Sequence, residues 1–139
     1  MKLIYQTTEG GISVATAAPG KDLRALASKI VPAGSAWKIV PDDAIPTDRV
    51  FRDAWKLEEE TLVEDLSASR EIAHNLRREK RSEEFRPHDE LMAVRIPGTD
   101  EEGVEASRQE IRDRYAVIEQ QIDDCETVEE LHEQVNTIY

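Results

Sequence analysis

Residues 96–122, which read IPGTDEEGVEASRQEIRDRYAVIEQQI, decide the fold of this chain. Pro97-Gly98 should end any helix that precedes it. Thr99-Asp100-Glu101-Glu102 then matches a capping box, in which Thr99 and Glu102 would bind each other's backbone N–H groups. The apolar residues that follow are spaced by 7, 4, 3 and 4, which is typical of one helix face; they are Val104, Ile111, Tyr115, Ile118 and Ile122.

A second helix is predicted before this break, from Asp65 or Ser67 onward, and it should form an antiparallel helical hairpin with the first. Ile72, Ala73 and Leu76 share one face of it, whereas the basic run 77–81 (RREKR) should be solvated. Pro87 should kink or restart the helix, because proline lacks the N–H that bonds the carbonyl four residues earlier. Apolar residues return before the turn; they are Leu91, Met92, Val94 and Ile96.

A short terminal helix should follow the hairpin. Thr127-Val128-Glu129-Glu130 repeats the capping-box pattern. The apolar positions after it again follow helical spacing; they are Val128, Leu131, Val135 and Ile138.

The first forty residues predict a compact ββαβ unit. Alternation around Leu3-Tyr5 and around Ile12-Val14 indicates two strands, joined by a turn at Gly10-Gly11. Residues 21–30 have the apolar spacing of a helix, and Trp37–Val40 is a third strand. Residues 55–57 and 61–64 flank an acidic turn and predict a further hairpin.

Three of the seven aromatic residues, Trp37, Phe51 and Trp55, lie near the end of this N-terminal part. A cap at Thr47 or Asp48 would start a short helix that places Phe51 and Trp55 on one face. A core for the α+β part is the first interpretation of these aromatic residues, and an anchor for a partner protein is the second. Arg49 and Arg52 suit either role.

These patterns together predict an α+β fold. A small α+β head would span residues 1–65, and a helical region, made of the hairpin and the short terminal helix, would span 66–139. The chain has 139 residues, enough for one compact unit with a helical extension.

The charge of the chain is strongly negative and unevenly distributed. There are 30 acidic and 18 basic residues, giving a net charge of −12. Residues 99–139 alone hold 13 acidic and 3 basic residues, a balance of −10. Such a segment repels phosphates and anionic membranes, so we expect no nucleic-acid or membrane partner. The single Cys125 cannot form an internal disulfide, which fits a reducing compartment.

Catalytic and metal-binding patterns are weak. Glu71-x-x-His74 and Glu129-x-x-His132 resemble half-sites of di-iron bundles, but two further inward glutamates on long helices are missing. Cys125 continues the apolar register and has acidic neighbours, so it should be a packing residue rather than a nucleophile. We therefore expect no catalytic residue, metal or cofactor.

One stretch resembles a known family. Ala36-Trp37-Lys38-Ile39-Val40-Pro41, followed by residues 45–55 (IPTDRVFRDAW), is similar to the W-x-I-V and P-x-D-R-x-F-R-x-A-W motifs of small phage and prophage proteins. These are called phage tail proteins or tail fibre assembly chaperones. The segments 66–74 (LSASREIAH) and 127–131 (TVEEL) resemble the family's later helix starts.

The resemblance implies a bacteriophage tail-associated protein that is not an enzyme. It would bind a tail fibre or another tail component, as an assembly chaperone or as a structural adaptor. Its place would be the host cytoplasm during assembly or the tail of the virion. The expected contact residues are Arg49, Phe51, Arg52, Trp55, Ile111, Tyr115, Ile118 and Ile122. The concentration of acidic residues leaves an alternative open, an inhibitor or DNA mimic that acts on a host nucleic-acid enzyme.

Overall fold

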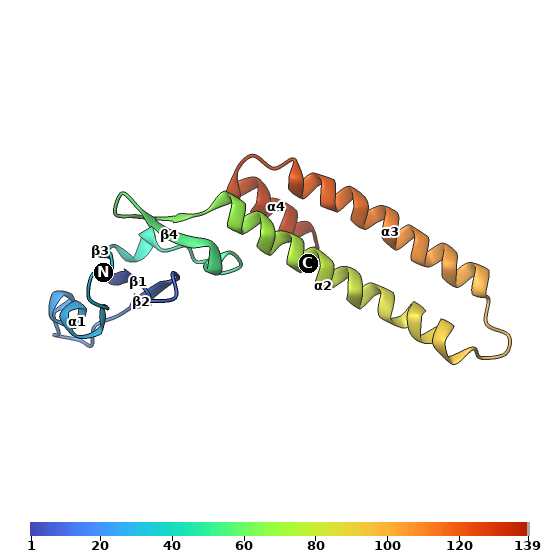
Figure 1. Ribbon diagram of the computed structural model, residues 1–139, viewed down its shortest axis with the longest axis horizontal. Helices are drawn as coiled ribbons and strands as arrows, with labels where there is room; N and C mark the ends of the chain where they lie inside the picture. The colour runs from blue at the N-terminus through green and yellow to red at the C-terminus, as the bar shows by residue number, and fades with distance from the viewer. Residues whose placement is uncertain (139) are drawn as a thin grey trace. The chain divides into compact units, whose positions relative to one another are not determined.

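The computed structural model describes residues 1–138, and its fold is α+β, as the sequence predicts (Figure 1). The chain forms two compact units, Met1–Ser69 and a helical unit that begins at Arg70. The first unit holds all the strands, which are β1 (Lys2–Gln6), β2 (Ile12–Ala15), β3 (Trp37–Val40), β4 (Trp55–Glu58) and β5 (Thr61–Glu64). The α-helices are α1 (Leu23–Ile30), α2 (Leu66–Val94), α3 (Glu101–Asp123) and α4 (Val128–Ile138).

A three-stranded antiparallel sheet, ordered β2-β1-β3, forms the centre of the first unit, and β4 and β5 form a separate hairpin. Ile4 lies in the middle strand, paired with Val14 on one side and Lys38 on the other. Successive side chains of a strand point to opposite faces, so Leu3 lies on the other face from Ile4. Both are fully buried, and α1 contacts β1 and β3.

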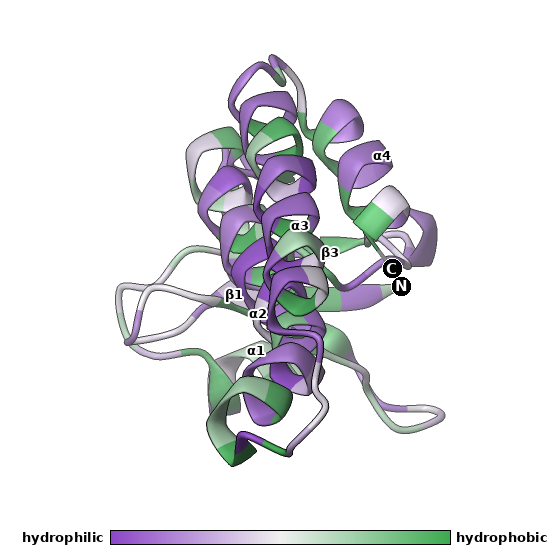
Figure 2. Ribbon diagram, turned by 90° about the vertical axis from the view of Figure 1, so that its right-hand side faces the viewer, coloured by the Kyte–Doolittle hydropathy of each residue, from purple (hydrophilic) through white to green (hydrophobic). Residues whose placement is uncertain are grey.

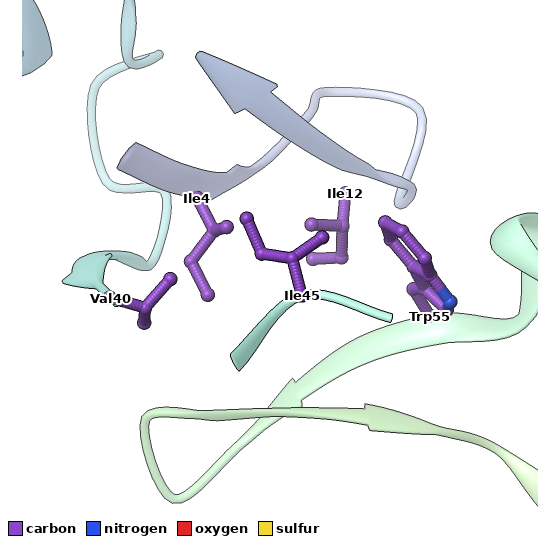
Figure 3. Packing of buried hydrophobic residues seen from close by; sticks show 5 residues of the cluster. All are labelled: Ile4, Ile12, Val40, Ile45 and Trp55. Carbon is purple, nitrogen blue, oxygen red and sulfur yellow. The ribbon is translucent and has the colours of Figure 1, made fainter. Parts of the chain in front are cut away.

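One hydrophobic cluster joins the sheet to the segment that follows it. Figure 3 shows side chains from the sheet converging on those of the following loop and of β4. The cluster consists of Ile4, Ile12, Val40, Ile45 and Trp55. Trp55 is therefore a core residue, as the first interpretation of the aromatic residues predicts.

Trp37 does not belong to this core, contrary to the prediction. It lies in β3, at the edge of the sheet and opposite Tyr5, and 44% of its surface is exposed. An edge strand has a neighbour on one side only, so fewer side chains are available to cover a large ring.

The prediction of a short helix after Pro46 is also wrong. Only a single 3₁₀ turn, Arg52–Ala54, forms there, and Trp55 already begins β4. The Asp48 carboxylate accepts a hydrogen bond from the Val50 N–H at 3.0 Å, a local turn that competes with helix. Phe51 and Trp55 are nevertheless both buried.

The helix ends confirm part of the capping predictions. Asp65 caps α2 by accepting from the Ala68 N–H at 2.9 Å, and this bond, followed by that from Lys56, lowers the pKa of its carboxyl. Thr127 accepts from the Glu130 N–H, as expected. At α3 the cap is Asp100, which accepts from Gly103, so the predicted Thr99 cap is wrong.

Pro87 does not restart α2, which continues as one helix to Val94. Proline removes a single backbone hydrogen bond, and Pro87 lies on an exposed part of the helix surface. Figure 1 shows α2 and α3 side by side and in opposite directions, which confirms the hairpin.

The core of the helical unit lies mainly on α3 and α4. Its buried residues include Ile122 and Leu131, which are fully covered, and α4 packs against α3. Polar residues dominate the rest of these helices (Figure 2). Among residues 1–138, no helix is both long and apolar enough to cross a membrane.

Replacing Leu131 with Ala should lower the free energy of unfolding of the helical unit by about 2–5 kcal/mol, because it leaves a cavity in this core. Urea unfolding followed by far-ultraviolet circular dichroism measures it. The matched control is Val117→Ala on α3, where 57% of the side chain is exposed, and its effect should stay within about 0.5 kcal/mol. Both tryptophans lie in the first unit, so their fluorescence follows the unfolding of that unit separately. Equal effects of the two variants would contradict this assignment of the core.

Candidate functional site

The predicted contact residues of the first unit do come together. The guanidinium carbon of Arg49 lies 5.1 Å from the centre of the Trp55 ring, and that of Arg52 lies 5.9 Å from it. Such cation–π contacts hold the two arginines over a buried ring. Phe51 is fully buried, whereas Arg49 and Arg52 are exposed. Only the two arginines therefore present much surface to a partner.

The predicted contact residues of α3 are mostly buried within the helical unit. Ile111, Tyr115 and Ile122 are buried, and Ile118 is half-buried. The pKa of the Tyr115 hydroxyl is raised, mainly because the group is buried and secondly because the Glu84 carboxylate lies nearby. These residues stabilise the helical unit, and little of their surface is left for another protein.

Polar and charged side chains link α2 with α3, and one of them is Arg77, which the sequence predicts to be solvated. Arg77, expected in a solvated run, is buried, and its Nη1 lies 3.3 Å from Glu119 Oε2. His74 is also buried, and its Nε2 lies 2.7 Å from Asp123 Oδ1. Farther along the hairpin the signs reverse, and α3 supplies the cations; the pairs are Arg114–Glu84 at 2.6 Å and Arg108–Asp89 at 3.1 Å.

The sequence positions of these four pairs could have predicted the contacts between α2 and α3. In each pair the two residues lie almost equally far, in sequence, from the turn at Pro97-Gly98. An antiparallel hairpin brings such positions face to face. Complementary charges placed symmetrically about a predicted helix break would have identified them.

The residues considered for metal binding and for nucleophilic catalysis make contacts within the fold instead. Glu71, which the metal hypothesis paired with His74, contacts Arg78 instead. Within residues 1–138, no three His, Cys, Asp or Glu side chains are grouped so that they could hold a metal ion. Cys125 is buried, and its Sγ–H donates to the Gln121 carbonyl at 3.2 Å, which confirms it as a packing residue.

The end of the hairpin carries exposed apolar side chains. Leu91 is 40% exposed, Val94 65% and Ile96 51%. We call these three residues the hairpin-end patch. Isolated apolar residues are common on protein surfaces, but a group of large ones is typical of a contact with another molecule.

Comparison with known proteins gives no relative: no family model, curated protein or solved structure matches this chain.

Reversing the charge of Arg77 tests the cross-helix pairing. Arg77→Glu should destabilise the helical unit by about 2 kcal/mol or more, because it places a buried carboxylate opposite Glu119. Adding Glu119→Arg should restore about 1 kcal/mol, since the pair is re-formed with opposite signs. Arg86→Glu is the control, because Arg86 is exposed on the same helix. If the double variant is no more stable than Arg77→Glu, the pairing does not contribute to stability.

The Cys125 thiol should react slowly while the chain is folded. Burial, and after it the carboxylate of Glu130, raises its pKa, so the reactive thiolate is scarce at pH 8. Modification by Ellman's reagent should be about tenfold slower or more than in the same chain unfolded in urea. Equal rates would mean that the thiol is accessible in the folded protein.

Proposed function

We propose that this chain is a non-enzymatic phage tail-associated protein, which binds a tail fibre or another tail component as an assembly chaperone or structural adaptor. Two observations support the proposal. One is the resemblance of residues 36–55 to small phage tail proteins. The other, which carries the structural part, is the hairpin-end patch of Leu91, Val94 and Ile96.

The patch has the chemistry of a protein contact. Covering an apolar side chain of this size contributes about 1.5–3 kcal/mol when its burial is complete. Three such residues within six positions can therefore support an interface, whereas the other large apolar residues of the helical unit up to residue 138, apart from Val117, are buried or half-buried.

Acidic residues flank the patch on both sides of the turn. They are Glu90, Asp100, Glu101 and Glu102. One exposed cation, Arg95, lies between Val94 and Ile96. Glu101 and Glu102 also lie in the first turn of α3, where negative charge stabilises the helix. The complementary partner surface is therefore apolar at its centre and basic at its rim.

A tail fibre subunit fits this description while it is folding. Fibres are long trimers dominated by contacts between residues distant in sequence, so apolar edges stay exposed until assembly is complete. A chain that covers such an edge transiently acts as a chaperone. A chain that stays bound is an adaptor.

The test is co-expression with the fibre protein encoded in the same phage or prophage genome. Changing Leu91, Val94 and Ile96 together to serine should weaken fibre binding by about tenfold or more, from the lost apolar burial. Val117→Ser is the matched control, because it also removes an exposed apolar side chain from the helical unit. It should leave binding unchanged. Equal binding by both variants and the original chain would exclude the patch as the contact.

Mass spectrometry of purified particles separates the two roles. A stoichiometric copy number in the particle would identify an adaptor. Absence from the particle, together with a higher yield of soluble fibre trimer on co-expression, would identify a chaperone. If the chain does not bind the fibre, is not incorporated into particles and does not change the trimer yield, the proposed function is overturned.

A further inference from the structure

A recess with an arginine-rich lining lies in the helical unit, and its lining contains none of the three residues of the hairpin-end patch. Its volume is about 340 Å³. Residues of α2 and α3 form its walls, and the residues that matter below are Arg78, Arg81, Phe85, Asp89, Arg108 and Arg112. Four cations and one carboxylate among the lining residues give it a positive charge, although the whole chain carries −12.

Three of these arginines gather around a single aromatic ring. The guanidinium carbons of Arg81, Arg112 and Arg108 lie 5.2, 5.8 and 6.0 Å from the centre of the Phe85 ring. Attraction to the ring offsets part of the repulsion between the guanidinium groups. It also orients them, so the three guanidinium groups lie in one small region, where Nη1 of Arg112 already donates to Glu105 and to Gln109.

The carboxylates nearby neutralise only part of this charge. Glu105 accepts from Arg112 at 2.8 Å and from Arg108 at 2.9 Å, and the hydrogen bond from Arg112 is the main cause that lowers the pKa of its carboxyl. Asp89 pairs with Arg108 as well. Arg81 makes no ion pair with any of residues 1–138, and the buried Nε of Arg108 has no acceptor among them.

We propose that this recess binds one oxyanion group, a carboxylate or a phosphate, with Arg81 and Arg112 as its main donors. A guanidinium offers a planar fork of N–H donors that matches either group. A nucleic-acid strand fits poorly, because its many phosphates would also meet the negative charge that surrounds the recess. This site does not depend on the proposed tail function, because neither the hairpin-end patch nor a fibre takes part in it.

Calorimetric titration of the full chain tests the site, with inorganic phosphate, acetate and citrate as separate probes at matched ionic strength. At least one probe should bind saturably at a single site. Arg81→Gln should weaken that binding by about tenfold, the loss expected for one charge-assisted contact. Arg81→Lys should weaken it less, because the charge remains while the planar fork is lost.

Arg86→Gln is the matched control. It removes the same charge from the same helix, and Arg86 is exposed and does not line the recess. Binding by this variant should equal that of the original chain, and circular dichroism should show both glutamine variants folded. Saturation by phosphate alone, or by the carboxylates alone, would identify the source of the oxyanion. No saturable binding of any probe, or equal loss in the Arg81 and Arg86 variants, would overturn the proposal.

Discussion

The antiparallel pairing of charges between α2 and α3 is the interaction on which the helical unit depends. The pairs change direction along the hairpin, since α2 supplies the cation Arg77 in its first half and the anions Glu84 and Asp89 nearer the turn. A slide of about seven residues, or two helical turns, would place Arg77 opposite Arg112 and Glu84 opposite Glu105. The charge order therefore selects one register. The apolar residues of α3 could not select it alone, because a helical apolar stripe repeats at every turn.

This pairing reduces the number of free carboxylates in the acidic residues 99–139. Glu119 and Glu105 each lie against an arginine of their own unit, so part of the negative charge is neutralised within the molecule, and Asp123 is hydrogen-bonded to His74. That observation weakens the case for a DNA mimic, which needs free carboxylates. It also leaves Arg81 without a carboxylate, and this imbalance makes the recess positive. Up to residue 138, the large apolar side chains exposed in the helical unit are thus those of the hairpin-end patch and Val117, whereas most of the seam of α3 is buried.

Sequence patterns predicted the elements better than the side-chain surroundings. The strands, the hairpin and the Asp65 cap depend on local periodicity and local hydrogen bonding, which a sequence displays directly. The burial of Arg77 and His74 depends on what lies across from them, and only the fold supplies that partner. Trp37 is exposed for the same kind of reason, because nothing in the sequence ranks β3 as an edge strand. Ile111, Tyr115 and Ile122, predicted as contact residues, are buried in the unit, because helical periodicity alone does not distinguish a core stripe from a contact stripe.

Pro87 has a consequence for motion at the far end of α2. It has no amide hydrogen, so the carbonyl of Glu83 loses its helical partner, and the last two turns connect to the body of the helix through fewer bonds. Local opening should begin there, and amide protons after residue 87 should exchange with solvent sooner than those near Ala73. Leu91 and Val94 lie on this looser segment. A molecule that docks on them would restrict its fluctuations, so its affinity would include a conformational entropy loss that a rigid surface does not impose.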